Sequence, residues 1–309
     1  MHRLTKESME KIRSAHPIDF TLFGALGATT AEICQDISRG FAGKQFEFMD
    51  HAEFEALVPN LSAMNLIYWK EILFRIYSAS ALNILRHRQW QNACICAFRS
   101  PGNLIAFAAG MRGLLEGAQD VCYSLGSIPL SLAQNRPRIE SALTGNMRDM
   151  AFVIDGFEDR LIHFVYGRKI GKTDGEIFPN SHVAKEPKDY RNAIGLPEEQ
   201  RELFRQLYDH LCGICHPTTF SLAHFLEAKT NGFRITPGKD ETYILALCRK
   251  YESVISLSLS LSITLSAVCL KALNWFPLPE VKCIEVEKWN FDNVIIWRKA
   301  QAAATGSIM

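Results

Sequence analysis

The stretch SVISLSLSLSITLSAVCL, residues 253–270, decides how the chain folds. Its eighteen uncharged residues reach the length of a membrane span, and its alternation of apolar and hydroxyl side chains resembles a strand. Seven of the eighteen are serine or threonine, which is more polar than a typical membrane span. As a helix, the stretch has one apolar stripe that includes Leu257, Leu261 and Leu265, with a second stripe nearly opposite. We therefore expect a buried central helix, packed on two sides.

Two further helices are expected upstream of this stretch. Residues 61–88 carry apolar side chains at mixed three- and four-residue spacing, without glycine or proline, which indicates a long helix. Ser100 and Pro101 are suited to be the N-cap and first-turn proline of the helix that follows. On that helix six apolar residues share one face: Leu104, Ala108, Met111, Leu115, Ala118 and Cys122. These segments predict at least one helical hairpin.

The remaining segments complete the expected outline of the chain. Residues 131–166 have a broken helical pattern, whereas residues 167–197 are rich in glycine, proline, asparagine, aspartate and lysine, which is typical of a looped connector. We expect an all-α helical bundle with its core at residues 61–276. Residues 1–60 are expected as an N-terminal extension packed on this core, and residues 277–309 as a C-terminal segment.

Positive and negative residues are almost equal in number, so the net charge of the protein does not attract nucleic acid or an anionic membrane. The 309 residues include 34 lysines and arginines against 33 acidic residues, so any contact with RNA must be a local patch. The N-terminal segment MHRLTKESMEKIRSAH carries charges throughout and has no apolar core of the kind that a signal peptide requires. We expect a cytoplasmic protein that does not contact a membrane. Its nine cysteines are then expected to be reduced and mostly buried.

The segment CGICH, residues 212–216, has the spacing of a c-type haem attachment site, a partial zinc site or a redox pair. Haem attachment requires export, for which no signal is recognised. His210, Cys212, Cys215 and His216 are possible zinc ligands, but four ligands on one helix cannot surround a tetrahedral ion. No second CxxC or HxxxH completes the set. We expect two buried helical thiols here, with no metal and no cofactor.

Candidate functional residues lie on two helices. On the first, Arg112, Glu116 and Asp120 follow one another at four-residue spacing beside the apolar face. The second is expected to run from Pro197 to about residue 216. One of its faces gathers four polar residues within roughly 60°: Arg205, Asp209, Cys212 and His216. A solvated charge stripe is the simpler interpretation of the first group.

His216 is the leading candidate for chemistry. Pro217 disfavours helical geometry at the preceding residue, so the helix should end near His216. The negative end of the helix dipole favours a protonated histidine, which suits proton transfer or phosphate contact, although a structural cap of the helix end is equally simple. We expect Arg112, Glu116 and His216 to approach one another, because each lies on the polar side of a helix whose apolar side faces the same core.

The two helices together resemble HEPN-like helical proteins of bacteria, in particular a branch with an Arg-x-x-x-Glu helix and a later Tyr-x-x-Leu-Cys/Ser-x-x-x-His-Pro helix. The matching residues are Arg112, Glu116, Tyr208, Leu211, Cys212, His216 and Pro217. The resemblance covers roughly residues 60–275 and implies a helical bundle, often dimeric. It also implies that many relatives are metal-independent ribonucleases of toxin or phage-defence systems, with an Arg-x(4–6)-His motif across the dimer. Others are non-catalytic nucleotide-binding or scaffold modules.

The sequence departs from the catalytic motif of that family. Its Arg-x(4–6)-His match runs from Arg205 to His210, whose side chains point roughly 140° apart on one unbroken helix. The pair could therefore meet only across an interface or after a break in the helix. Arg112 and His216 are better placed if the two helices pack together.

Two hypotheses follow. In the first, the protein is an RNA-cleaving or RNA-binding effector without metal, in which Arg112 neutralises a phosphate and His216 acts as general acid or base. Glu116 would complete that catalytic set, and Arg205, Asp209, Tyr208 and Asp120 would bind the ligand. In the second, the protein is a non-enzymatic adaptor or ligand-binding module in which Arg112, Glu116 and His216 form a buried polar network. The expected partner is RNA, a second copy in a homodimer, or another protein.

Overall fold

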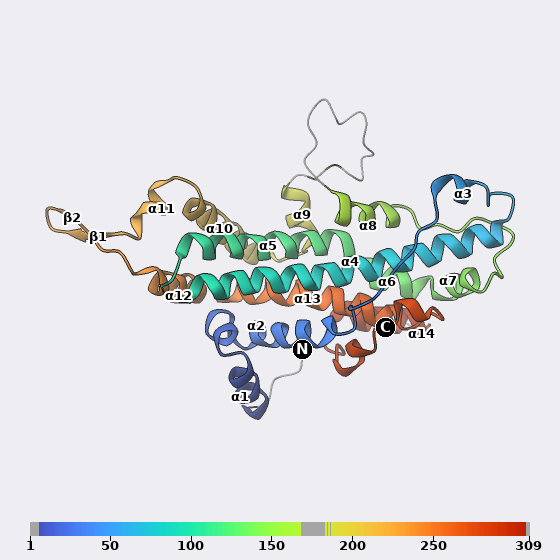
Figure 1. The fold of residues 1–309 in the computed structure, drawn as a ribbon, viewed down its shortest axis with the longest axis horizontal. Helices are drawn as coiled ribbons and strands as arrows, with labels where there is room; N and C mark the ends of the chain where they lie inside the picture. The colour runs from blue at the N-terminus through green and yellow to red at the C-terminus, as the bar shows by residue number, and fades with distance from the viewer. Residues whose placement is uncertain (1–5, 100, 168–182, 184, 186, 307–309) are drawn as a thin grey trace.

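The computed structural model describes residues 6–99, 101–167, 183, 185 and 187–306. These residues form a helical bundle that is elongated along its longest helices (Figure 1), with one two-stranded antiparallel sheet among them. The all-α prediction is confirmed.

Three long helices form the centre of the bundle. α4 (Leu61–Phe98) and α5 (Leu104–Leu125) make an antiparallel hairpin, and α13 (Glu252–Leu273) packs against both (Figure 1). α4 has 38 residues and is therefore about 57 Å long. The predicted helix over 61–88 is confirmed and continues ten residues further, to Phe98. The six residues expected on one face of α5 are all buried.

The predicted cap of α5 is wrong. The helix begins at Leu104, and its N-cap is Asn103, whose Oδ1 accepts a hydrogen bond from the Ala106 amide at 2.9 Å. Asparagine is as good a cap as serine, so local sequence alone favoured neither position. Ser100 lies outside the described residues.

The serine-rich stretch is a buried helix, as expected. Asn83 on α4 donates hydrogen bonds to the hydroxyls of Ser262 and Ser266 at 3.1 and 2.9 Å. The Ser258 hydroxyl donates to the Val254 carbonyl one turn earlier, at 2.8 Å. Among the described residues, α13 is the one helix long and apolar enough to cross a membrane by length and composition, and 67% of its most apolar window is buried within the bundle.

The other elements surround these three helices. In chain order they are α1 (Lys6–Ala15), α2 (Pro17–Ser38), α3 (His51–Glu55), α6 (Ile128–Gln134), α7 (Arg136–Leu143), α8 (Phe157–Tyr166), α9 (Pro187–Ala193), α10 (Glu198–Cys215), α11 (Thr219–Ala223), β1 (Leu226–Lys229), β2 (Gly232–Ile235), α12 (Asp240–Lys250), the 3-10 turns η2 (Pro279–Val281) and η3 (Ile284–Lys288), and α14 (Ile295–Thr305). The broken helical pattern over 131–166 thus corresponds to three short helices, and α10 ends at Cys215, just before His216 and Pro217.

Helices from the expected N-terminal extension and from the expected connector both pack on the central helices. Within residues 1–60, α2 packs along α13 and kinks at Gly24, whose φ of 70° is readily adopted by glycine alone. α2 therefore supplies buried side chains to the bundle. Within the expected connector 167–197, residues 187–193 form α9, which packs on α5, and residues 168–182, 184 and 186 lie outside the described chain.

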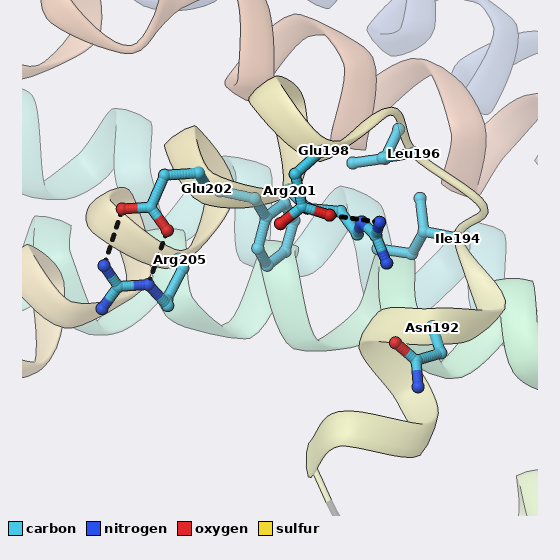
Figure 2. A pocket seen from close by; sticks show the side chains of 8 residues that line it. Asn192, Ile194, Leu196, Glu198, Arg201, Glu202 and Arg205 are labelled. Atoms are coloured by element: carbon cyan, nitrogen blue, oxygen red, sulfur yellow. Dashed lines mark hydrogen bonds and ion pairs between the residues drawn. The ribbon is translucent and has the colours of Figure 1, made fainter.

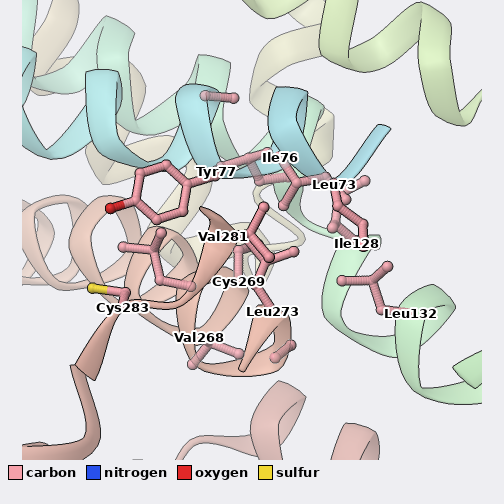
Figure 3. Packing of buried hydrophobic residues seen from close by; sticks show 14 of the residues in the cluster. Leu73, Ile76, Tyr77, Ile128, Leu132, Val268, Cys269, Leu273, Val281 and Cys283 are labelled. Atoms are coloured by element: carbon pink, nitrogen blue, oxygen red, sulfur yellow. The ribbon is translucent and has the colours of Figure 1, made fainter. Parts of the chain in front are cut away.

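The buried apolar side chains form two clusters along the bundle. The first cluster is built around Trp69 and Leu73 of α4 and the C-terminal half of α13, and Figure 3 shows part of it, including Ile76, Val268 and Leu273. The second cluster joins the other ends of α4, α5 and α13 to α10 and α12. Three long helices therefore contribute to both clusters.

A belt of buried polar residues separates the two clusters. Along α4, the first cluster ends at Ile84 and the second resumes at Cys94, and the buried residues between them include His87 and Gln91. Corresponding positions on the other helices are also polar and buried: Thr30 on α2, Gln119 on α5 and Ser262 on α13. The Gln91 amide and the Thr30 hydroxyl both donate hydrogen bonds to the Gly27 carbonyl, at 3.1 and 2.7 Å. We call this layer the polar belt.

Candidate functional site

A cleft of about 670 Å³ is bounded by α4, α5, α8, α9 and α10. Its walls carry charged and aromatic side chains side by side. The lining residues are Arg86, Trp90, Arg112, Gly113, Glu116, Gly117, Gln119, Asp120, His163, Phe164, Gly167, Lys185, Tyr190 and Tyr208. The volume lies within the range of roughly 300–1,000 Å³ that is usual for small-molecule sites.

Glycines on α5 shape one wall of the cleft. A Cβ atom at Gly113 would lie 2.5 Å from the Trp90 ring, so the indole lies directly on the backbone of α5. One turn further, a Cβ atom at Gly117 would lie 3.9 Å from Nε of Arg86. The absence of side chains at both positions lets Trp90 and Arg86 of α4 extend across α5 into the cleft. Trp90 remains 39% exposed there.

Arg112, Glu116 and Tyr208 form a triangle on one side of the cleft. The Tyr208 hydroxyl donates a hydrogen bond to Glu116 Oε1 at 2.7 Å. Arg112 Nη2 donates to the same carboxylate oxygen at 3.2 Å and to the Tyr208 hydroxyl at 3.4 Å, and its guanidinium lies 5.4 Å from the centre of the Tyr208 ring. Burial and the bond to Glu116 raise the pKa of Tyr208, so its hydroxyl keeps its proton.

Arg86 and Asp120 face each other along the same wall. Arg86 Nη2 lies 2.9 Å from Asp120 Oδ2, and the guanidinium stacks 4.9 Å from the centre of the Phe164 ring. Burial raises the pKa of Asp120, while Arg86 and, more weakly, His163 oppose that shift. Arg86 also donates to the Asn83 side chain at 3.3 Å, which links the cleft to the serines of α13.

His163 on α8 closes the end of the cleft nearest Asp120. It is 3% exposed, and its Nε2 lies 2.8 Å from the Tyr190 hydroxyl. Tyr123 packs edge-on against both rings, with centroid distances of 5.3 and 5.4 Å. The three rings form an aromatic corner that connects α5, α8 and α9.

Arg86 and Arg112 each have one fully buried side-chain nitrogen behind the cleft wall. The Nε–H groups of Arg86 and Arg112 are buried, and neither forms a hydrogen bond with the described residues. In each arginine another nitrogen, Nη2, binds a carboxylate. Both Nε atoms are closed off from the cleft itself, so a ligand there would meet the exposed parts of the two guanidinium groups, whose side chains are 38% and 25% exposed.

The structure brings four of the predicted site residues to this cleft and leaves three outside it. Arg112, Glu116, Asp120 and Tyr208 line the cleft. His216 follows the end of α10 and is exposed, and its side chain makes no hydrogen bond or ion pair with the described residues. The expected approach of His216 to Arg112 therefore does not occur through any such bond within the described part of one chain.

Arg205 and Asp209 lie on the outer face of α10. Arg205 is bound to Glu202 and to Asp209, and it borders a smaller pocket beside Asn192 and Leu196 (Figure 2). The pairing with Glu202 lowers the pKa of that carboxyl to about 2 and raises the pKa of Arg205. The charges of Arg205 and Asp209 are thus already compensated by oppositely charged neighbours on α10.

The CGICH segment contains two half-buried thiols beside Arg112. Burial raises the pKa of Cys215, and Arg112 opposes the shift. Cys212 is likewise half-buried. In the part of the chain that the structure describes, no group of three or more histidine, cysteine or acidic side chains has an arrangement suited to a metal ion.

Several residues of the cleft were not predicted from the sequence, among them Arg86, Trp90, His163 and Tyr190. Arg86 and Trp90 are four residues apart and so share one face of α4, opposite a stripe of glycines on α5. Large side chains on one helix opposite glycines on the next predict that the two helices pack closely together. His163 and Tyr190 belong to short helices whose placement depends on tertiary contacts, so no local pattern could have paired them.

Comparisons with protein-family models, with curated proteins and with solved structures found no match for this chain. The resemblance to HEPN-like proteins therefore stays a prediction.

Proposed function

We propose that this protein is a helical ligand-binding module whose cleft takes a small molecule with a planar ring and an anionic oxygen group, of the nucleotide class. The observation that carries the proposal is that the partly exposed guanidinium side chains of Arg86 and Arg112 line one cleft together with the exposed indole of Trp90. Phosphate or carboxylate oxygens are the acceptors that guanidinium groups bind best.

The surrounding side chains suit both the planar ring and the anionic group of such a ligand. Trp90 lies flat on Gly113 with part of its surface exposed in the cleft, which offers a stacking face for a planar ring. Lys185 joins the two arginines in the lining, against the carboxylates of Glu116 and Asp120. The cleft thus carries one more positive than negative side chain when all five are charged, which favours a ligand of low negative charge.

Calorimetric titration with adenosine monophosphate tests the proposal, with adenosine and inorganic phosphate as the two halves of the probe. We expect the whole nucleotide to bind more tightly than either half, and to raise the melting temperature. Arg112→Met should weaken binding by roughly tenfold to a hundredfold, the loss of one charge-assisted hydrogen bond.

Arg205→Met is the matched control. It also removes an arginine that is paired with carboxylates, but outside the cleft, so binding should be unchanged. Equal weakening by the two variants, or no binding of nucleotide, adenosine or phosphate, would refute the proposed site.

Ribonucleolytic activity is a second proposal, supported by one observation: a histidine, His163, shares the cleft with Arg86 and Arg112. A histidine for proton transfer beside cations for the phosphate is the minimum set for metal-independent RNA cleavage. A labelled single-stranded RNA tests it. His163→Ala should abolish cleavage and His216→Ala should preserve it; the reverse would restore the role predicted for His216, and no cleavage by the parent protein would end this proposal.

A further inference from the structure

The β1–β2 hairpin extends beyond one end of the helix bundle (Figure 1). Its register pairs Leu226 with Ile235 and Ala228 with Phe233, so these four side chains share one face of the hairpin. That face is open to solvent: Phe233 and Ile235 are 68% and 70% exposed. A two-stranded hairpin alone is marginally stable in water, and a third or fourth strand would stabilise it.

The outer edge of β1 has free backbone groups. The Thr236 amide donates to the Phe225 carbonyl at 2.8 Å, which makes this pair hydrogen-bonded across the two strands. Because hydrogen-bonded and non-hydrogen-bonded pairs alternate along an antiparallel ladder, Leu226 and Ala228 direct their amide and carbonyl groups away from β2. A strand added to the edge of β1 would therefore bind through these two residues.

We propose that the occupant of this edge is the β1 strand of a second copy of the chain, paired antiparallel about a twofold axis at Ala228. The two Ala228 residues would exchange their outward amide and carbonyl groups, giving a four-stranded sheet in the order β2, β1, β1 of the partner and β2 of the partner. Such an interface is isologous, as a twofold axis requires.

Charge selects this register over its neighbours. Centred on Ala228, the pairing places Glu227 of each copy opposite Lys229 of the other, on the polar face of the sheet. A register centred on Glu227 would use the same outward backbone groups, with Leu226 of each copy bound to Ala228 of the other, but it would place the two Glu227 carboxylates opposite each other. Within one chain Glu227 and Lys229 already attract each other, with their charged atoms 2.6 Å apart. Opposite charges across strands stabilise a sheet, and like charges destabilise it.

The apolar face supports the same register. Each Ala228 would have Phe233 beside it on β2 and the partner's Ala228 on the other side, so two small side chains lie between two large rings. The rings can then cover the alanines and reduce the exposure of both. Because the hairpin is at the end of an elongated bundle, the two bodies would extend in opposite directions from the new sheet (Figure 1).

Sedimentation over a range of concentrations tests the inference on the full chain. The weight-average mass should rise from the monomer value of 34.9 kDa toward twice that value. Ala228→Pro removes the outward amide without touching the β1–β2 bonds, and it should weaken association by at least about tenfold. Its far-UV spectrum should match that of the parent protein.

Charge-reversal variants of Glu227 and Lys229 give a second test, whose result cannot arise from local unfolding of the hairpin. Lys229→Glu and Glu227→Lys should each be monomeric alone, because like charges meet in both self-pairings. Mixed in equal amounts, the two variants should form a heterodimer, since every Lys then faces a Glu. A parent protein that stays monomeric, dimerisation that survives Ala228→Pro, or a mixture that does not associate would each overturn the inference.

Discussion

His87 is a buried histidine of the polar belt. It is 3% exposed on α4, and its Nε2 is buried without a hydrogen bond to the described residues. Burial, together with the neighbouring Arg88 and Arg86, lowers the pKa of this histidine to about 3. The folded protein therefore holds His87 neutral at neutral and mildly acidic pH.

This burial predicts a loss of stability in mild acid. The unfolded chain binds a proton at His87 below a pH of about 6.5, whereas the folded chain does not until its depressed pKa of about 3. The contribution is fully present above the unfolded pKa and is lost as pH falls, by about 1.4 kcal/mol per unit, or about 2 kcal/mol at pH 5. Urea unfolding at pH 7.5 and pH 5 should show this loss in the parent protein and a smaller loss in His87→Phe.

His51→Phe is the control for that comparison, because His51 is an exposed residue paired only with Glu55 among the residues that the structure describes. Its acid sensitivity should equal that of the parent. If His87→Phe and the parent lose the same free energy between the two pH values, His87 is not the buried titrating group that we describe.

For single residues, the sequence could predict only those contacts that lie within one helix. The contact between Arg112 and Glu116 follows from their four-residue spacing and was expected, whereas the contact of Arg86 with Asp120 joins two helices. His216 shows the limit of such local patterns. The helix was expected to end near His216 and ends at Cys215, but the direction of the histidine beyond it depends on the path of the chain after Pro217.

The packing of α4 on α5 depends on individual glycines, and the two that line the cleft should respond differently to alanine. At Gly117 the nearest neighbour of a Cβ is Arg86 at 3.9 Å, so Gly117→Ala should stabilise the helix by about 0.5–1 kcal/mol. At Gly113 a Cβ would enter the Trp90 ring, so Gly113→Ala must displace the indole from α5. The gain in helix propensity is then offset by lost packing.

Fluorescence and denaturation measure the two effects. Gly113→Ala should shift the emission of Trp90 to the red, with a stability no higher than that of the parent, and should weaken nucleotide binding at the cleft. Gly117→Ala should leave the emission unchanged. Identical behaviour of the two variants would show that Trp90 does not rest on Gly113.

The long amphipathic elements were predictable because their apolar period repeats over several turns, as at Leu104, Met111 and Leu115 of α5. The hairpin was not, since LEAK and GFRI are four residues each and have no run of β-branched residues. The short α9 within the connector was missed for the same reason: seven residues, opening with Pro187, contain too few turns for a periodic signal.

The bundle contains two apolar clusters separated by one polar belt. Its unfolding in one step or in two depends on how strongly the helices that cross the belt couple the clusters. Each of α4, α5 and α13 contributes buried residues to both clusters. A continuous helix that crosses the belt carries side chains of both clusters, so we expect unfolding at one end to destabilise the other. The belt itself restricts how the helices can slide, since Asn83 meets Ser262 and Ser266 in one register only.

We therefore predict that damage in the second cluster destabilises the first. Phe107 is fully buried in the second cluster, and Phe107→Ala should cost about 3–5 kcal/mol. Of the five tryptophans, all except Trp90 belong to the first cluster or pack against it, so in a Trp90→Phe background fluorescence reports that end alone. Urea midpoints from fluorescence and from far-UV dichroism should coincide, both at lower urea than in the parent. If fluorescence keeps the parent's midpoint while dichroism falls in two steps, the clusters unfold independently, and the helices that cross the belt do not couple them.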